Sequence, residues 1–510
     1  MKKQIILNGN DLSLEELIMI SRNNVNIAID KKAETKINKS HNLLKKWVQQ
    51  KKRIYGVSTG FGALSDVNIS LKDTKKLQEN ILLSHSAGIG KSAPHDVVKA
   101  MMALRVNDFC KGNSGLKLKT IKKLADILNS GIVPVIPQKG SVGASGDLIP
   151  MSHLCLVLIG KGKAFVNNKK MSGLKALQKK SIKPLKLGSG EGLALINGTQ
   201  FMLALSCLAL YDAINLFKHA DIAASMSLET LLGTRTAFDP RIHKARPHNG
   251  QIKAADNMLR LTKNSQIISK HKDCSSIQDA YSLRCSPQVH GASWDALEHT
   301  KKVINTEMNS TTVNPLVFPE QQEYLFGGNF HGQPLSLACD FLSIATSEIA
   351  NISERRIERL VNPQLSGLPA FLIKDSGLNS GFMIAQYAAA ALVSENKVMS
   401  HPASVDSIPT SANKEDHVSM GAFAARKCCD IVENAENVIA IELLCASQAI
   451  DMFTNLKAGT GVLEAYKTIR SKIDFMTEDR MLSKDIAIVK KLIKEKTIVK
   501  NVEAKTGRLY

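Results

Sequence analysis

The sequence has few aromatic residues and no cysteine pattern of the kind that metal sites or disulfide frameworks need. Aromatic residues make up 5% of the chain, and the nine cysteines are scattered, with Cys428 and Cys429 adjacent and no C-x-x-C. An odd, scattered set of cysteines is typical of reduced thiols in a cytoplasm. We therefore expect a cytoplasmic protein without a disulfide framework or a zinc site.

Long hydrophobic runs are also missing. The stretch Met1–Asn8 has only three apolar residues in a row, which is too short for the apolar region of a secretory signal. The longest apolar stretch, roughly Phe201 to Tyr211, is well below the ~20 residues needed to span a bilayer. We interpret it as a buried helix and expect no membrane association.

Acidic residues are too few to balance the basic ones. The chain has 67 Lys and Arg against 46 Asp and Glu, which gives a formal net charge of +21. The lysines are dispersed, however, and are not clustered with interleaved aromatic residues. A dispersed lysine excess is typical of a solvated surface, so we expect no nucleic-acid partner. No polar cluster has a metal-ligand spacing such as H-E-x-x-H, and we expect no metal and no nucleotide.

The remaining composition favours helices. Ala, Leu, Ile, Ser, Lys and Glu dominate the 510 residues, a length that suggests two to four domains. Ser13-Leu14-Glu15-Glu16 is a capping box and predicts a helix start. Helices are expected at 97–127, broken at 112–115, and at 151–160. After residue 200 the pattern is long and helical, with Ala-rich apolar faces and little strand alternation.

One segment stands apart as the densest cluster of small residues: Gly140-Ser141-Val142-Gly143-Ala144-Ser145-Gly146-Asp147-Leu148-Ile149-Pro150. Glycine adopts backbone conformations closed to other residues, and proline removes a donor, so the segment is predicted to be neither regular helix nor strand. A tight surface loop is the simplest interpretation. The tripeptide Ala144-Ser145-Gly146 suggests a second one.

The second interpretation is a covalent modification of the backbone. In a strained loop the Gly146 amide nitrogen could reach the Ala144 carbonyl carbon, because glycine has no side chain in the way. Two dehydrations would give a five-membered ring, the second turning the Ser145 side chain into an exocyclic methylidene. Such a ring is an electrophile that the twenty side chains do not supply, so it would act as a cofactor.

Two other glycine-containing motifs imitate known sites incompletely. Gly56-Val57-Ser58-Thr59-Gly60 matches the nucleophile elbow of α/β-hydrolases, but it lacks the preceding hydrophobic strand and the following helix. A loop displaying Tyr55 fits better. Gly90-Lys91-Ser92 ends like a phosphate-binding loop, but His85 stands where that loop needs its first glycine.

Several segments resemble those of the aromatic amino acid ammonia-lyase family. They cover most of the chain in the family's order: 55–62, 83–90, 140–150, 191–200, 238–251, 278–288, 327–333, 354–372 and 394–420. The run Gly-Ser-Val-Gly-Ala-Ser-Gly-Asp-Leu is the most specific of them. In this family Ala-Ser-Gly cyclises autocatalytically to 4-methylideneimidazol-5-one (MIO), which the resemblance places at Ala144, Ser145 and Gly146.

The resemblance also implies the fold class, mainly α. It suggests an N-terminal helical domain (1–195) that carries the MIO-forming loop, followed by a central and C-terminal long-helix bundle (196–510). It further implies a homotetramer whose active sites draw residues from three subunits. Helix N-termini are expected to point at the prosthetic group, where their positive ends would increase its electrophilicity.

The family's chemistry assigns roles to individual residues. Tyr55 matches the base that removes the β-proton, so neighbours must lower its pKa from near ~10 for it to act at neutral pH. Arg284 matches the residue for the substrate carboxylate, because its planar fork can bind both oxygens. Further positions match contacts to the substrate or the prosthetic group: Asn197, Gln278, Tyr281 and, packing against the ring, Phe330.

Two positions bear on the substrate. Ser84-His85 is the pair that histidine-specific members carry, whereas tyrosine and phenylalanine enzymes have His-Leu or Phe-Leu. Glu415 can accept a hydrogen bond from an imidazole N–H, where the phenylalanine and tyrosine enzymes usually carry Gln. The resemblance therefore implies deamination of L-histidine to trans-urocanate and ammonia. A tyrosine or phenylalanine lyase or 2,3-aminomutase is the alternative, and a non-catalytic homologue is another.

Three features depart from the family's pattern. Lys414 stands where Gln is frequent, next to Glu415. Ser58 replaces the Asn common in histidine enzymes. Gly188-Ser189-Gly190 stands where many relatives have a lead-in with Pro and Lys. We do not expect any of these to remove activity.

Overall fold

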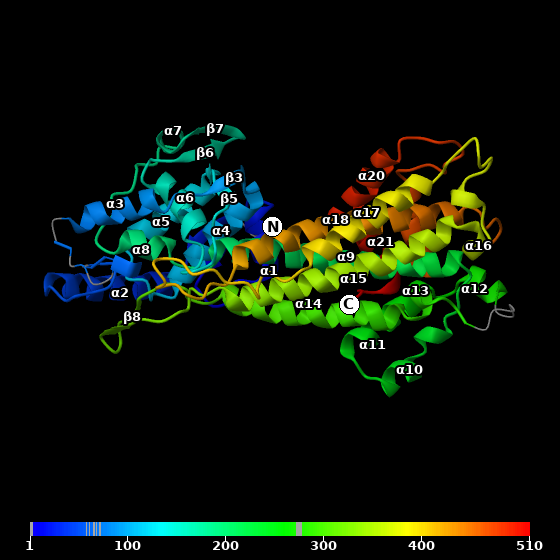
Figure 1. Cartoon of the computed structure of the whole chain (residues 1–510), viewed down its shortest axis with the longest axis horizontal. Helices are drawn as coiled ribbons and strands as arrows, with labels where there is room; N and C mark the ends of the chain where they lie inside the picture. The colour runs from blue at the N-terminus through cyan, green and yellow to red at the C-terminus, as the bar shows by residue number, and fades with distance from the viewer. Residues whose placement is uncertain are drawn as a thin grey trace. The chain divides into compact units, whose positions relative to one another are not determined.

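The computed structural model of the chain describes residues 4–57, 59–60, 62–64, 67, 69–70, 73–271 and 278–510. Those residues are mainly helical (Figure 1). They form two compact units, each assembled from three stretches of chain. The first unit is Met1–Leu208, Lys301–Asp340 and Pro402–Arg426; the second is Ala209–Thr300, Phe341–His401 and Lys427–Tyr510. The domain boundary expected between residues 195 and 196 stays a prediction, because compact units need not fold separately.

The first unit contains short helices and small sheets. Its helices are α1 (Leu14–Ser21), α2 (Lys31–Gln49), η1 (Gly62–Leu64), α3 (Thr74–Ser84), α4 (His95–Cys110), α5 (Leu118–Asn129), α6 (Leu148–Leu158), α7 (Gly173–Lys179) and α8 (Glu191–Ile196). Its strands are β1 (Gln4–Leu7), β2 (Asn26–Ile29), β3 (Ile89–Ser92), β4 (Val133–Pro134), β5 (Pro137–Lys139), β6 (Lys163–Val166), β7 (Lys169–Ser172), β8 (Leu316–Phe318) and β9 (Glu323–Leu325). The pair β1–β2 is parallel, while β3–β5, β4–β6–β7 and β8–β9 are antiparallel.

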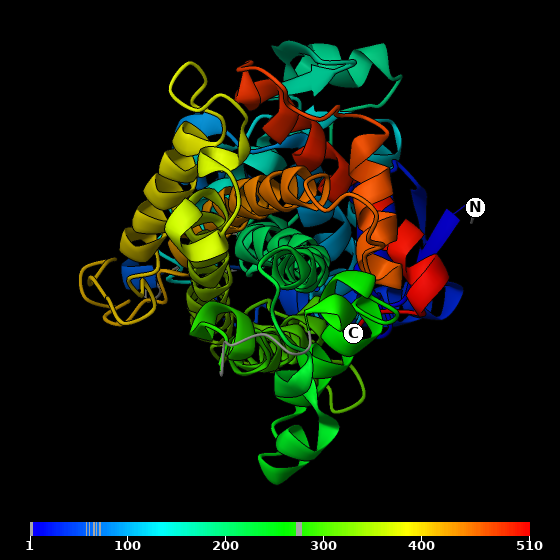
Figure 2. The ribbon, with the colours of Figure 1, turned by 90° about the vertical axis from the view of Figure 1, so that its right-hand side faces the viewer.

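Four long helices contribute residues to both units: α9 (Gln200–Thr230), α14 (Ser286–Met308), α15 (Gln333–Val361) and α18 (Gly421–Ile450). The other helices of the second unit are η2 (Thr236–Phe238), α10 (Pro240–Ala245), α11 (Asn249–Leu261), α12 (Gln266–Lys270), α13 (Tyr281–Arg284), α16 (Pro363–Ser366), η3 (Ala370–Leu372), α17 (Met383–Met399), α19 (Thr460–Arg470), α20 (Leu482–Lys494) and α21 (Thr497–Thr506). Figure 2 views the bundle of this unit nearly along its long helices.

Local sequence signals explain several boundaries. Ser13 caps α1 through the predicted capping box, because its side chain accepts from the Glu16 backbone and the Glu16 side chain accepts in return. The helices expected between 97 and 127 are α4 and α5, and the break at 112–115 is confirmed. Helix α4 is buried on nearly every side, and its interior includes a charged residue, Arg105.

Two helices, α9 and α15, are long and apolar enough to cross a membrane by length and composition. The most apolar window of α9 is 83% buried inside the structure, and that of α15 is 67% buried. Burial of this extent identifies both as core helices. The buried helix predicted at Phe201–Tyr211 is therefore confirmed as the first part of α9.

Candidate active site

The segment Gly140–Pro150 is irregular as far as Asp147, and α6 begins at Leu148. The prediction that the whole segment avoids regular structure was wrong for its last three residues. Pro150 lies in the first turn of α6, where a helix needs no donor from its backbone nitrogen. Gly143 and Gly146 have φ values of 72° and 77°, in the left-handed region that favours glycine.

Gly146 is pressed against a second backbone segment. It forms an isolated bridge with Gly198 in the linker between α8 and α9. The Asp147 backbone N–H donates to the Gly198 carbonyl at 2.7 Å. A Cβ placed on Gly146 would collide with that carbonyl. Only glycine allows this close approach at position 146, and the contact holds the backbone of the tripeptide from one side.

Asp147 ties the segment to the start of α9. One of its carboxylate oxygens accepts from the Ser141 hydroxyl at 3.0 Å, and the other accepts from the Met202 N–H at 2.8 Å. Burial raises the pKa of Asp147 to about 7, although these hydrogen bonds act to lower it. A carboxyl with this pKa can both accept and return a proton near neutral pH.

The start of α18 also contacts the segment. The Met420 N–H donates to the Val142 carbonyl at 2.9 Å, and the Ser419 hydroxyl donates to the Gly143 carbonyl at 3.2 Å. The segment therefore precedes one helix, α6, and touches the N-terminal ends of two others, α9 and α18. The positive ends of these helices create a favourable potential for developing negative charge.

Glu415 meets the tripeptide from a distant part of the sequence. The Ser145 hydroxyl donates to one Glu415 carboxylate oxygen at 3.1 Å, and the Thr410 hydroxyl donates to the other at 2.9 Å. Glu415 is half-buried, whereas the side chain of its neighbour Lys414 is exposed. The loop that carries Glu415 is held by backbone hydrogen bonds between Thr410 and Glu415.

A cavity of about 380 Å³ opens beside these groups. Its volume suits a single small-molecule ligand. Its walls combine the small-residue segment with polar residues from two other places in the chain: Ser84, His85, Ala87, Gly140, Ser141, Val142, Gly143, Ala144, Gly146, Leu148, Ile149, Thr410 and Glu415. Five of the site residues named from the sequence, Ser84, His85, Ala144, Gly146 and Glu415, therefore line one cavity.

Ser84 and His85 lie at the C-terminal end of α3. The Ser84 hydroxyl is 3.0 Å from Nδ1 of His85. Burial lowers the pKa of His85 below its ordinary value, against opposing effects of the Ile81 carbonyl and the Glu415 carboxylate. The imidazole is therefore neutral at neutral pH, so it has one N–H donor and one acceptor nitrogen.

Tyr55 lies in the same unit, on the loop that precedes η1. Its phenol oxygen accepts from the Gly62 N–H at 2.9 Å. Burial raises the pKa of Tyr55, the Gly62 hydrogen bond lowers it, and the Glu415 carboxylate raises it further. Within one chain the net effect is a raised pKa, opposite to the lowering that a base at neutral pH needs. Ser58 lies outside the described residues.

A buried glutamine fixes the Tyr55 loop. Gln78 on α3 donates through Nε2 to the Gly56 carbonyl at 3.1 Å and accepts from the Gly192 N–H at 2.8 Å. Gln78 thus links the residue after Tyr55 to the start of α8. Asn197 follows α8, and its buried side-chain Oδ1 has no hydrogen-bond partner among the described residues. Phe330 lies half-buried in a turn between β9 and α15.

The remaining three site residues named from the sequence, Gln278, Tyr281 and Arg284, belong to the second unit. Tyr281 begins the short helix α13 and is 70% exposed. The Arg284 guanidinium stacks over the Tyr281 ring at 4.6 Å from its centre. This stacking orients the planar fork of Arg284 while leaving the tyrosine ring available for contact.

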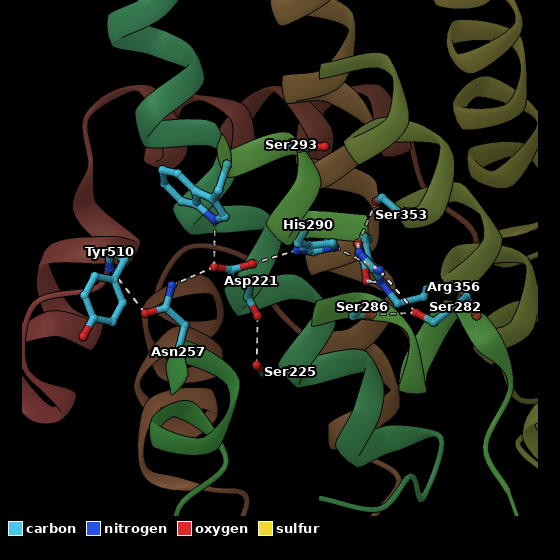
Figure 3. A network of polar contacts seen from close by, with 12 residues as sticks. Asp221, Ser225, Asn257, Ser282, Ser286, His290, Ser293, Ser353, Arg356 and Tyr510 are labelled. Carbon is cyan, nitrogen blue, oxygen red and sulfur yellow. Dashed lines mark hydrogen bonds and ion pairs between the residues drawn. The ribbon is translucent and has the colours of Figure 1, made fainter. Parts of the chain in front are cut away.

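A buried polar network supports α13 (Figure 3). Arg356 on α15 is ion-paired with Glu442 on α18 and donates to the Ser282 carbonyl at 3.4 Å, between Tyr281 and Arg284. His290 on α14 contacts Asp221 on α9 at 2.7 Å and lies 3.4 Å from Arg356 Nη1. The side chains of Asp221, His290, Arg356 and Glu442 are fully buried. The backbone of α13 is thus held by Arg356, which the network joins in turn to Glu442 and His290.

Comparison with known proteins identifies the family. A profile described as "Aromatic amino acid lyase" matches residues 12–471. A protein of Alkaliphilus oremlandii named "Histidine ammonia-lyase" is 52% identical over 501 residues, which cover 98% of this chain and 99% of that protein. The chain belongs to the aromatic amino acid lyase family. The membership predicted from the motifs is confirmed.

Two solved structures that resemble the chain are named for different substrates. Histidine ammonia-lyase from Trypanosoma cruzi is 43% identical with a TM-score of 0.92, covering 98% of this chain and 95% of that one. Tyrosine aminomutase from Streptomyces globisporus is 34% identical with a TM-score of 0.94, covering 99% and 100%. The long-helix bundle is thus common to both. Because backbones of both kinds fit equally well, the side chains of the site have to decide the substrate.

Some residues of the site were not found from the sequence. Thr410 orients Glu415, Gly198 supports Gly146, and Met202 binds Asp147, yet none stands out in a motif. A weak signal existed for Arg105, which is a charged residue inside the apolar run Met101–Val106 of α4. A charged residue in a helix that is buried all round needs partners, and these are found only in the folded chain.

Proposed function

We propose that this chain removes ammonia from L-histidine without oxidation and releases trans-urocanate, the first step of histidine degradation. The observation that carries the proposal is the cavity of about 380 Å³ that Ala144 and Gly146 line together with Ser84, His85 and Glu415. The histidine ammonia-lyases that resemble the chain over nearly its full length support this substrate. Three polar side chains of the lining, Ser84, His85 and Glu415, support it independently, because they can hydrogen-bond an imidazole.

The residues at 144–146 fit an MIO group. Gly146 and Gly143 hold left-handed backbone conformations, and Gly146 is pressed onto the Gly198 carbonyl, as a compressed loop requires. Ala144 is small and lines the cavity. Oδ1 of Asn197, next to Gly198, has no hydrogen-bond partner in the part of the chain that the structure describes, so it is an acceptor available to a group formed there. We infer that the ring is built from Ala144, Ser145 and Gly146, with Asp147 moving protons during the two dehydrations.

An MIO group would supply an electrophilic methylidene that takes up the substrate amine and makes it a better leaving group. The chain's own residues perform the remaining work. The Tyr55 phenolate takes the β-proton, and the C–N bond breaks as the Cα=Cβ double bond forms. Because burial raises the Tyr55 pKa within one chain, positive helix ends and bound substrate have to favour the phenolate.

Substrate recognition uses charge and hydrogen bonding. Arg284 binds the carboxylate with its planar fork, beside Tyr281. The imidazole of the substrate lies between Ser84-His85 and Glu415, where its N–H and its acceptor nitrogen both find partners. A phenyl or phenol ring would leave these polar groups unpaired, which disfavours tyrosine and phenylalanine. Three further side chains complete the contacts: Asn197, Gln278 and Phe330.

We infer that the working form is a homotetramer in the cytoplasm, with active sites shared between subunits. Tyr281 is 70% exposed although its proposed role requires contact with substrate, which supports completion of the site by other copies. The second unit also exposes large apolar side chains on α15 and α17: Phe341, Ile344, Ile384, Tyr387 and Val398. An apolar surface of this kind is typical of an interface between copies. Light scattering tests the tetramer.

Incubation with histidine, tyrosine and phenylalanine tests the proposal. We expect urocanate absorbance from histidine and little coumarate or cinnamate. Turnover of tyrosine or phenylalanine without histidine would support the alternative, a lyase or 2,3-aminomutase for those amino acids. Intact-mass measurement is the second readout: a chain that keeps its full unmodified mass would make any MIO-dependent reaction untenable and leave a binding or structural protein.

A further inference from the structure

Arg105 occupies an unusual place for a charged residue. It lies in the interior of α4 and its side chain is fully buried. Its guanidinium also stacks on the Phe109 ring at 4.3 Å from the centre. Burying a charge is costly unless it is paired and hydrogen-bonded, so the contacts of this residue should have a purpose.

The contacts of Arg105 converge on the linker between α8 and α9. Nη2 donates to the carbonyls of Ala194 and Asn197, both at 2.6 Å. Nη1 donates to the Gln200 side chain at 2.9 Å and to the Asp108 carboxylate at 2.9 Å. The planar fork therefore grips the end of α8 and the first residue of α9 at once. Its positive charge also lies at the negative C-terminal end of α8.

A second layer holds this grip in place. The Asp108 carboxylate accepts from Gln200 Nε2 at 3.0 Å and from the Thr312 hydroxyl at 2.9 Å. Gln200 Nε2 also donates to the Thr312 hydroxyl at 3.0 Å. Together Arg105, Asp108, Gln200 and Thr312 form what we call the linker clamp. All of its members belong to the first unit.

Gly198 lies between the linker clamp and the tripeptide. On one side its carbonyl accepts from the Asp147 N–H and lies where a Gly146 side chain would be. On the other side a Cβ on Gly198 would collide with Gln200 and Arg105. The linker therefore cannot retreat from Gly146 without displacing the clamp. The position of Gly198 behind the tripeptide therefore depends on the linker clamp.

We propose that Arg105 is a positioning residue for formation of the MIO ring, an inference that rests on the proposed function. Ring closure joins the Gly146 nitrogen to the Ala144 carbonyl carbon. The carbonyl oxygen leaves as water with the amide hydrogens of Gly146 and Ser145, and a C=N bond to the Ser145 nitrogen remains. Ser145 then loses its hydroxyl and its Cα hydrogen as a second water. No oxidant is needed. The first step requires the Gly146 nitrogen and the Ala144 carbonyl carbon to be pushed together. Gly198, which the linker clamp holds in place, prevents Gly146 from moving away.

Arg105→Lys tests the proposal, because an ammonium group keeps the charge but cannot bridge four acceptors in one plane. The fraction of chains that have lost two waters is followed by intact mass at intervals after cell-free synthesis. We expect ring formation to slow by about tenfold or more, since a small misplacement of reacting atoms has effects of this size. The amount of product formed per ring-bearing chain should change much less than the rate of ring formation. A general loss of structure would lower both.

Arg356→Lys is the matched control. Arg356 is a second fully buried, ion-paired arginine, but it belongs to the other unit, and its hydrogen-bond partners there are Glu442, Ser282 and His290. The Arg356→Lys substitution should lower the unfolding temperature by about as much as Arg105→Lys does, while ring formation stays complete. Equal slowing in both variants would mean that ring formation only reports stability, and would overturn the proposal.

A milder variant covers the case in which Arg105→Lys does not fold. Thr312→Val keeps the shape of the side chain and removes the hydroxyl that holds Asp108 and Gln200. We expect slower ring formation in this soluble variant, and formation at the wild-type rate would overturn the linker clamp. These outcomes can be told apart from a failure of the proposed function. A wild-type chain without the ring would contradict the function itself, whereas ring formation at the wild-type rate in the variants would contradict only the role of the linker clamp.

Discussion

The Ser145 hydroxyl donates a hydrogen bond of 3.1 Å to the Glu415 carboxylate, joining residues that are 270 positions apart. Ser145 is the proposed source of the electrophilic methylidene, and Glu415 is the proposed partner of the substrate imidazole. The residue proposed to give reactivity and the residue proposed to give substrate selectivity are therefore in direct contact. Substituting each of the two residues tests a different half of the proposed function.

Ser145→Ala should leave a folded chain that cannot form the ring. The hydroxyl is the group lost in the second dehydration, so the mass should not show the loss of two waters and kcat should fall by about a thousandfold or more. Ser152→Ala is the control, because it removes a buried hydroxyl on the adjacent α6 that donates to the Leu148 carbonyl within the same helix. Full activity in Ser145→Ala would refute the role of the segment.

Glu415→Gln should weaken the preference for histidine. The amide oxygen can still accept from Ser145, so the ring should form, but the charge that strengthens a hydrogen bond from imidazole is lost. We expect kcat/KM for histidine relative to tyrosine and phenylalanine to fall by about tenfold to a hundredfold. Asp416→Asn removes a like charge from the exposed neighbour and should change the ratio little. An unchanged ratio in Glu415→Gln would contradict its role in recognition.

Tyr55→Phe should form the ring and lose about a hundredfold to ten-thousandfold in kcat, the contribution typical of a positioned base. In the wild type, burial raises the pKa of Tyr55, and only the phenolate accepts a proton. The rate should therefore rise with pH between about pH 7 and about pH 9. A residual rate in Tyr55→Phe that kept this rise would show that another group is the base.

Arg356→Lys should raise the KM for histidine while leaving the ring intact. Lysine cannot keep both the bidentate pair with Glu442 and the contact with the Ser282 carbonyl, so α13 loses a support between Tyr281 and Arg284. We expect a rise in KM of about tenfold and a smaller change in kcat. Arg470→Lys perturbs a comparable pair with Asp451 in the same unit and is the control. A lowered unfolding temperature without a change in KM would restrict Arg356 to a structural role.

Glu229→Gln should remove part of the pH dependence of stability. The Glu229 carboxylate accepts from the Gly459 N–H, and burial raises its pKa from 4.5 to about 8. The folded state therefore binds this proton more tightly than the unfolded state. Stability from this group is fully present below about pH 4.5 and is lost as pH rises toward about 8, with a slope of up to about 1.4 kcal/mol per pH unit.

The neutral glutamine keeps an acceptor for Gly459 and has no such slope. Urea midpoints of both proteins at about pH 5 and about pH 8 measure the difference. The wild type should lose more stability than Glu229→Gln between the two values. Parallel changes in the two proteins would show that Glu229 does not carry a raised pKa.

Much of this protein was determined by the sequence itself. Capping at Ser13, the break between α4 and α5, and the buried start of α9 depend on residues close together in the chain, so local patterns predict them. The motif around Ala144-Ser145-Gly146, which ends at Asp147 and Leu148, indicated the family. Ser84, His85 and Glu415 were named from the same resemblance.

Tertiary structure decided which of these residues meet and what their groups can do. No pattern in the sequence places Glu415 beside Ser145 or Gly198 behind Gly146, because contacts over such separations depend on how several helices pack. The raised pKa of Asp147 and the lowered pKa of His85 follow from burial, which is a property of the folded chain. Arg105 is a charged residue in a buried helix, and only the folded chain shows the groups that pair with it.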